Sequence, residues 1–175
     1  MRLFAAAFIT QKIAEKMYEY CEPSAEYFKF KRVPPEKMHV TVKYFGDEDY
    51  ENCLKIVEKS VKDIEKFEIA VKGVNFFSRG KYAGVLWAGI YDKTSSLNKI
   101  ALNIDGSLKS YIAHITLARF KNGIVENSVL DKYLSENSAK EKEFGNFTVE
   151  RIVLADSILE ARASRYKILK EFCLR

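Results

Sequence analysis

"MHVTVKYFG" occupies residues 38–46 and "AHITLARF" occupies residues 113–120, and the fold and the chemistry both follow from these two stretches. Each sets a histidine, one apolar residue and a threonine in a hydrophobic frame. His39 and His114 are also the only two histidines in the 175 residues. A chain that places both of its imidazoles in copies of one short pattern is expected to use them together.

The alternation of polar and apolar residues in each stretch predicts a β-strand with one buried face. Side chains on a strand point alternately to opposite faces, so His39 and Thr41 share one face and the valines that follow them share the other. His114 and Thr116 share a face in the same way. We therefore expect the apolar residues to anchor each strand and the polar residues to face a common cleft.

Short β-like runs and amphipathic helical runs alternate along the rest of the chain. Strands are predicted at residues 2–9, 38–45, 67–75, 83–91, 111–119 and 147–155. Helices are predicted from Thr10 to about Tyr20, after Gly46 with Asp47 as the cap, near 94–104 behind Thr94, and near 126–136. The prolines in "VPP" at 33–35 predict an extended, turning segment.

The spacing of the two histidine strands indicates an internal duplication. They lie 75 positions apart, from 39 to 114, and each is followed by a turn and a helix. This arrangement predicts two β–α lobes that each contribute one strand to a shared cleft.

Composition indicates an ordered globular chain of one domain or two small lobes. Hydrophobic residues make up 47% and charged residues 30%, a balance that gives no reason to expect disorder. The longest apolar runs, such as "GVLWAGI", are too short to span a bilayer. The opening "MRLFAAAFIT" has no cleavage region of a signal peptide, so it is expected to form a buried first strand.

Cysteine usage and net charge constrain the compartment and the partner. Cys21, Cys53 and Cys173 show no CxxC spacing, which favours reduced thiols of a cytoplasmic protein over a disulfide frame or a zinc knuckle. A net charge of +5 mildly favours a polyanionic partner and decides nothing by itself.

Two imidazoles and two hydroxyls that face one another suit in-line attack on a phosphodiester. One neutral and one protonated histidine can act as base and acid at the same pH, and hydroxyls can bind an anionic oxygen between them. A structural or surface role for each histidine is the simplest competing interpretation. A zinc site is another, but no His, Cys or carboxylate lies at ligand spacing from either pattern. We therefore expect neither a metal nor a cofactor.

The paired patterns resemble those of the 2H phosphoesterase superfamily, and specifically of its RNA 2′,3′-cyclic phosphodiesterases, also called 2′-5′ RNA ligases. The resemblance covers most of the chain and includes "MRLFAAAF", "MHVTVKYFGD", "GVLWAGI", "AHITLARF" and "VERIVLADSIL". It implies a single bilobal α+β domain over residues 1–175, with two pseudo-symmetric lobes. Each lobe is an antiparallel sheet with flanking helices, and the lobes surround a central water-filled groove. The implied activity is metal-independent hydrolysis of a terminal 2′,3′-cyclic phosphate to a 2′-phosphate, with reversible 2′-5′ ligation in some relatives.

Three departures from the family pattern are visible. The segment between "VLWAGI" and the second histidine stretch is shorter than expected, which bears on substrate size and groove shape. Ala113 stands where relatives often have proline. Val42 stands where leucine is usual, on the face expected to be buried.

The resemblance also implies roles for individual residues. It makes His39 the proton donor and His114 the proton acceptor, although nothing in the sequence fixes that order. Thr41, Thr116 and Arg119 become phosphate ligands. Strict alternation places Arg119 on the face opposite His114, so it can contribute only if the strand twists or ends there.

Several basic residues are candidate RNA contacts with equally simple surface interpretations. Lys43 shares the parity of His39 and is either a groove cation or a solvated strand lysine. Arg79 and Lys81 lie in "FFSRGKYAG", which suits either base stacking or a basic hairpin tip. Arg162 and Arg165 favour a basic surface over an RNA contact.

Two classes of function remain open. The first is an enzyme that acts on RNA ends or small cyclic nucleotides, and its substrate could instead be ADP-ribose 1″,2″-cyclic phosphate or a 2′-5′ oligonucleotide. The second is a noncatalytic RNA-binding protein that retains the groove. Either would be a monomer that needs no membrane.

Overall fold

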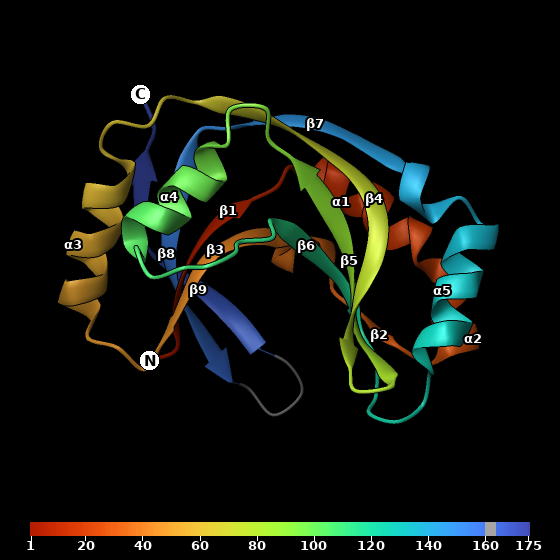
Figure 1. Ribbon diagram of the computed structural model, residues 1–175. Coiled ribbons are helices and arrows are strands. Elements are labelled where there is room, and N and C mark those ends of the chain that lie inside the picture. The colour runs from red at the N-terminus through yellow and green to blue at the C-terminus, as the bar shows by residue number, and fades with distance from the viewer. Residues whose placement is uncertain (160–163) are drawn as a thin grey trace.

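The computed structural model describes residues 1–159 and 164–175, and it is an antiparallel sheet covered by helices (Figure 1). The strands are β1 (Leu3–Phe8), β2 (Lys31–Arg32), β3 (His39–Gly46), β4 (Phe67–Arg79), β5 (Tyr82–Tyr91), β6 (His114–Arg119), β7 (Glu143–Val149), β8 (Arg151–Leu159) and β9 (Ser164–Cys173). The helices are α1 (Gln11–Tyr20), α2 (Glu22–Phe28), α3 (Tyr50–Val61), α4 (Ser96–Ile104) and α5 (Asn127–Glu136), with 3-10 turns η1 (Pro35–Lys37) and η2 (Ala139–Glu141).

The strand order divides the sheet into two equivalent halves. It runs β7-β4-β5-β6-β3-β1-β8-β9, and β2 pairs with the outer part of β6. In each half, the strand that carries the histidine pairs with an earlier strand, and a helical segment connects the two along the chain. β3 pairs with β1, and β6 pairs with β5. The two halves meet where β3 and β6 pair antiparallel at Val40 and Ile115. The predicted α+β class with two antiparallel lobes is confirmed.

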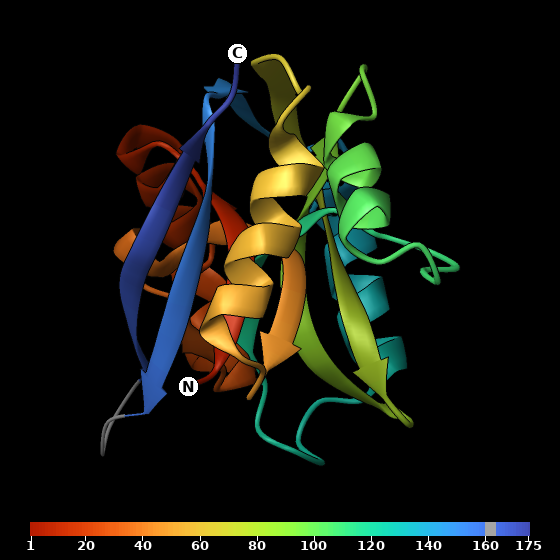
Figure 2. The ribbon, with the colours of Figure 1, turned by 90° about the vertical axis from the view of Figure 1, so that its left-hand side faces the viewer.

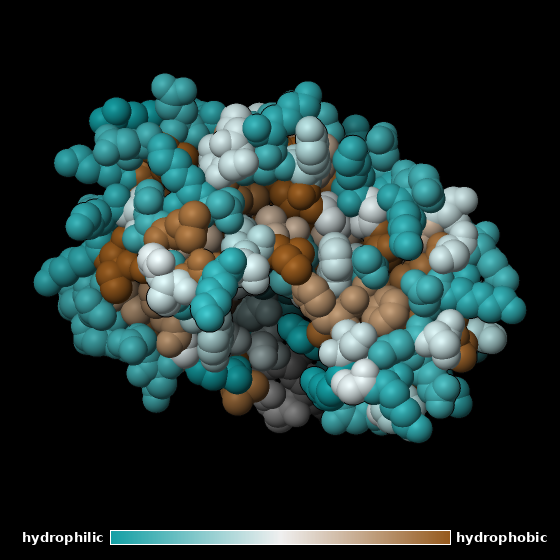
Figure 3. Space-filling model, in the orientation of Figure 1, coloured by the Kyte–Doolittle hydropathy of each residue, from teal (hydrophilic) through white to brown (hydrophobic). Residues whose placement is uncertain are grey.

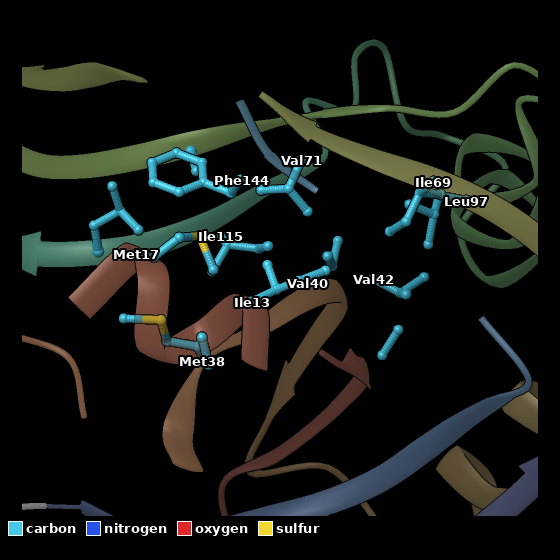
Figure 4. Packing of buried hydrophobic residues seen from close by; sticks show 14 of the residues in the cluster. Ile13, Met17, Met38, Val40, Val42, Ile69, Val71, Leu97, Ile115 and Phe144 are labelled. Carbon is cyan, nitrogen blue, oxygen red and sulfur yellow. The ribbon is translucent and has the colours of Figure 1, made fainter. Parts of the chain in front are cut away.

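The two paired residues at this junction are packed in the hydrophobic core. Val40 and Ile115 have no solvent exposure, and both belong to the main hydrophobic cluster. Figure 4 shows their side chains among those of Ile13 and Met17 from α1 and Val71 from β4. The apolar residues of both histidine strands therefore pack into one shared core. Their polar residues face the opposite side of the sheet.

Helices α1 and α4 cross between the halves. Helix α1 follows β1, yet it packs against β7 of the other half, where the rings of Tyr20 and Phe144 lie 5.4 Å apart. Helix α4 follows β5, yet it packs against β3 and α3. There the Asn103 side chain donates to the Ser60 carbonyl at 3.1 Å. Figures 1 and 2 show α3 and α4 side by side over the half that contains β8 and β9.

Some local predictions were wrong. The strand predicted at 147–155 is two successive strands separated by Glu150: β7, which pairs with β4, and β8, which pairs with β1 and β9. The cap of α3 is Asp49, whose carboxylate accepts from the Asn52 backbone N–H at 2.9 Å. Asp47 instead binds the N-terminal amino group at 2.8 Å. Helix α4 begins after Ser95 rather than Thr94.

The described residues also bear on membrane spans and on thiols. None of their helices combines the length and the apolar character needed to cross a bilayer. The three thiols are free, with Cys21 and Cys53 buried and Cys173 exposed. Burial raises the pKa of the Cys21 thiol to about 12, so this thiol stays protonated at neutral pH.

The position of Ile115 at the junction leads to a stability prediction. Truncation to Ile115→Ala removes a fully buried side chain and should lower the free energy of unfolding by about 2–5 kcal/mol, measured by urea denaturation. The matched variant Ile124→Ala removes a side chain that is 50% exposed and should change it by less than about 0.5 kcal/mol. Equal effects of the two variants would contradict the proposed role of the junction.

Candidate functional site

The register of β3 and β6 arranges the four polar residues as a square. Because Val40 pairs with Ile115 in an antiparallel ladder, His39 lies across from Thr116 and Thr41 lies across from His114. Directly opposed residues point to the same face, and diagonal neighbours have Cβ atoms about 7–8 Å apart. The two histidines therefore occupy one diagonal of the square and the two threonines occupy the other.

Two neighbouring cavities open over this square. The first, which we call the His39 cavity, has a volume of about 350 Å³ and includes His39, Thr41 and Thr116 in its lining. The second, the His114 cavity, includes His114 and again Thr41. Tyr44 also lines both, so the cavities form one groove across the junction. The surface in Figure 3 is hollowed between the two halves, with hydrophilic residues on both sides.

Both imidazoles are oriented by the same hydrogen bond. The Nδ1 atom of His39 lies 2.7 Å from the carbonyl oxygen of Lys37, and Nδ1 of His114 lies 2.8 Å from that of Ile112. A carbonyl oxygen can only accept, so Nδ1 must carry the proton in each ring. Each Nε2 is therefore a proton acceptor when the ring is neutral and a proton donor when it is charged.

The His39 ring is enclosed by aromatic side chains. The rings of Phe4, Phe8 and Tyr166 lie 5.1, 5.3 and 5.2 Å from it. This burial lowers the pKa of His39 to about 4. The charges of Arg119 and His114 act in the same direction, while the hydrogen bond to Lys37 opposes them. His39 is therefore neutral at pH 7 in the empty groove.

His114 has a different aromatic environment. Its ring is 4.9 Å from that of Phe77, edge to face, and 6.0 Å from that of Trp87. Phe77 and Trp87 stack on each other at 5.1 Å and come from β4 and β5 of the second half. The two similar motifs thus have different aromatic neighbours.

A β-bulge brings Arg119 onto the face of β6 that carries His114 and Thr116. The β5–β6 register pairs Trp87 with Thr116 but Leu86 with Ala118, so Leu117 is an extra residue in the ladder. An extra residue inverts the alternation after it. Leu117 and Ala118 are consequently both buried, and Arg119 lines the His39 cavity with Thr116.

Lys43 forms an ion pair with the end of α4. Its Nζ lies 2.6 Å from Asp105 Oδ2, at the end of α4. Hydrogen bonds from Lys43 and Ser107 hold the pKa of Asp105 at about 2. Lys43 does line the His114 cavity, but its charge is already balanced by a carboxylate.

Tyr111, in the segment just before the second histidine motif, is hydrogen-bonded to the backbone of the first motif. Its hydroxyl donates to the Thr41 carbonyl oxygen at 2.9 Å. Burial raises the pKa of Tyr111 well above its usual range, so the hydroxyl keeps its proton. This bond and the Lys43–Asp105 pair thus connect β3 to the segment that leads from α4 into β6.

Comparisons with known proteins identify the family of this chain. Residues 8–87 match the model of the LigT-like phosphoesterases. A relative from Methanocaldococcus jannaschii named RNA 2′,3′-cyclic phosphodiesterase is 30% identical over 98% of this chain and 100% of its own length. The chain belongs to the LigT-like phosphoesterase family. This family is part of the 2H superfamily and consists of enzymes.

Other relatives extend the match. A protein of the same name from Archaeoglobus fulgidus is 29% identical over 98% of this chain and 99% of its own. The crystal structure of TT0787 from Thermus thermophilus has a TM-score of 0.78 at 23% identity and covers 100% of this chain and 98% of that one. The structure of E. coli LigT complexed with 3′-AMP has a TM-score of 0.77 at 17% identity, over 99% and 97%. These two structures bear on the fold alone.

The phosphoesterase groove does not include every basic residue that the sequence suggested. Arg79 contacts Asn122 and Lys81 lies 5.1 Å above the Tyr82 ring, both at the tip of the β4–β5 hairpin. Neither lines the cavities over the square, whereas Phe77 from the same stretch does. Arg162 lies outside the described residues.

Other groove residues were not found from the sequence. Arg2 and Tyr166 line the His39 cavity, yet they stand at opposite ends of the chain. β8 carries both toward the motif, since Leu3 pairs with Asp156 and Tyr166 pairs with Ser157. No local pattern in the sequence reports such pairing. Among the described residues, no group of three or more His, Cys, Asp and Glu side chains is placed to hold a metal ion.

The enclosure of His39 predicts its titration. In ¹⁵N–¹H spectra of the free protein, His39 should titrate near pH 4 rather than near the ordinary value of about 6.5, and its neutral form should carry the proton on Nδ1. The variant His114→Ala leaves a single imidazole and provides the assignment. A midpoint near pH 6.5, or a neutral form protonated on Nε2, would contradict the geometry described above.

Proposed function

We propose that this protein is an RNA 2′,3′-cyclic phosphodiesterase that hydrolyses a terminal 2′,3′-cyclic phosphate to a 2′-phosphate. The observation that carries the proposal is the diagonal placement of two Nε2 atoms over one groove, with a hydroxyl at each remaining corner. Relatives of that name, at up to 30% identity over nearly the whole chain, support it.

The diagonal suits in-line displacement at phosphorus. Formation of a 2′-phosphate breaks the P–O3′ bond, so water attacks from the side opposite O3′. One imidazole must accept a proton from that water while the other gives a proton to O3′. Groups on opposite corners of the square can reach the two sides of a phosphate held between them.

We assign His39 as the proton donor to O3′ and His114 as the proton acceptor for water. Thr41 and Thr116 would donate hydrogen bonds to the nonbridging oxygens, and Arg119 would balance the charge that develops on them. Neither step requires a metal ion or a nucleophilic side chain.

The donor role sets a condition on His39. A ring whose pKa is about 4 is almost entirely neutral at pH 7, so it can donate only if bound substrate raises that pKa. An anionic phosphate does so in two ways, by adding a negative charge nearby and by pairing with Arg119, whose charge lowers the pKa of the empty site. Substrate binding would then bring a proton with it.

The same groove suits 2′-5′ ligation as a second activity. A 5′-hydroxyl in the place of water would give its proton to His114 and attack phosphorus, and O3′ would leave with the proton from His39. The observation that favours this reaction is the His114 cavity, where Tyr44, Phe77 and Ile112 leave room beside His114 for a group larger than water.

A panel of cyclic phosphates tests the function directly. We expect the protein to hydrolyse 2′,3′-cyclic nucleotides to 2′-phosphates in the presence of EDTA, with the product isomer identified by NMR or chromatography. Activity that EDTA abolishes and zinc or manganese restores would contradict the two-histidine mechanism. Binding of RNA without turnover of any cyclic phosphate would instead favour a noncatalytic role.

Substitution of the histidines tests their roles. His39→Ala and His114→Ala should each lower kcat by at least ~10²–10⁴-fold, with unchanged unfolding midpoints as the folding control. With a nitrophenyl ester, whose leaving oxygen needs no proton, His39→Ala should be largely rescued and His114→Ala should not. Rescue of His114→Ala alone would reverse the assignment, and rescue of neither would assign both rings to charge stabilisation.

A further inference from the structure

The two cavities over the catalytic square differ sharply in charge. Arg2, Lys37 and Arg119 line the His39 cavity, and the described residues of its lining include no carboxylate side chain. The His114 cavity has Lys43 as its cation, and Asp105 already pairs with that lysine at 2.6 Å. A polyanion that crosses the groove is therefore attracted to the His39 cavity.

Arg2 is held in place at the wall of this cavity. Its Nε donates to the Ser157 carbonyl oxygen at 3.1 Å and its Nη2 to Ser157 Oγ at 3.5 Å. A guanidinium has five N–H groups, and the hydrogen bonds to Ser157 use two of them, so the described residues leave three for a ligand. No carboxylate of the described residues forms an ion pair with this side chain. A fixed, partly buried guanidinium with spare donors suits bidentate binding of a phosphate.

The backbone of Arg2 lies well away from the square along the strand direction of β1. Ala6 pairs with Thr41, and Arg2 precedes Ala6 by four residues, which is roughly 13 Å of strand. Arg119 is the guanidinium close to His39. Arg119 ends β6 and Arg2 precedes β1, and these strands flank β3 on opposite sides. The cavity thus contains two guanidinium groups that enter it from opposite sides of β3.

We propose that Arg2, fixed by Ser157, binds the internucleotide phosphate next to the terminal cyclic phosphate, so that the site selects an RNA end over a cyclic mononucleotide. This inference rests on the function proposed above. It places the RNA strand in the His39 cavity, with O3′ beside His39, and leaves the His114 side for the attacking water.

Binding of reaction products tests the inference without relying on turnover. The ligands are adenosine 2′-phosphate and the dinucleotide adenylyl-adenosine ending in a 2′-phosphate, titrated by calorimetry into the wild type and into Arg2→Ala. The substitution should weaken the dinucleotide by about 10- to 100-fold, as expected for loss of a charge-assisted contact. It should change the affinity for adenosine 2′-phosphate by less than about two-fold.

A change in the ligand provides an independent test that needs no variant. Replacement of the internucleotide phosphate by an uncharged methylphosphonate should weaken binding to the wild type by a similar factor. The same replacement should have little effect in Arg2→Ala, because the partner of that phosphate is already gone. The slope of log affinity against log salt for the dinucleotide should also decrease by about 1 in Arg2→Ala.

Arg151→Ala is the matched control. Arg151 is an exposed arginine of β8 that already pairs with Glu171 at 3.6 Å, and its loss should leave both affinities unchanged. Equal weakening of both ligands by Arg2→Ala, no weakening of either, or full affinity of the wild type for the methylphosphonate would each overturn the inference. Failure of the wild type to hydrolyse the dinucleotide adenylyl-adenosine ending in a 2′,3′-cyclic phosphate would count against the proposed function instead.

Discussion

One backbone pairing, between Val40 and Ile115, determines the arrangement of the two histidines and two threonines. It fixes the register of two antiparallel strands, and that register decides which histidine lies across from which threonine. A shift by one residue would turn the polar set of one strand into the core. The burial of both apolar partners prevents such a shift. The hydrophobic face of each motif is thus what holds the reactive face in position.

The pairing also explains how two nearly identical motifs become chemically different. The nearest walls of the groove are supplied by other strands, and these are unlike. β1 and β9 enclose His39 with three aromatic rings, and β4 and β5 set only Phe77 and Trp87 against His114. Desolvation lowers the pKa of His39, although the local sequence around the two histidines is nearly the same. Two copies of one pattern thus have different surroundings because different strands lie next to them.

Whether a feature of the fold or the site could be predicted from the sequence depends on how far apart in the chain the interacting residues lie. The faces of both motifs were predictable because strand periodicity is local and the apolar residues alternate without interruption. The position of Arg119 was not, because the bulge at Leu117 exists only relative to β5. The Tyr111–Thr41 bond and the placement of Arg2 beside Ser157 depend on residues far apart in the chain. The error at Asp47 was of a different kind: two aspartates compete for one helix terminus, and the amino terminus binds the first.

The crossing of α1 and α4 between the halves has a consequence for how such a molecule can be assembled. In the strand order β3 corresponds to β6 and β1 to β5, and the helices that follow β1 and β5 correspond to each other. Two separate copies of a strand–helix–strand–helix unit, paired through such central strands, would form the same square of two histidines and two threonines. Each copy would lend the other its helix, so neither could close its own core. In a single chain, formation of the complete site does not depend on protein concentration. Each histidine and its surroundings can also change independently of the other, because each has its own codon.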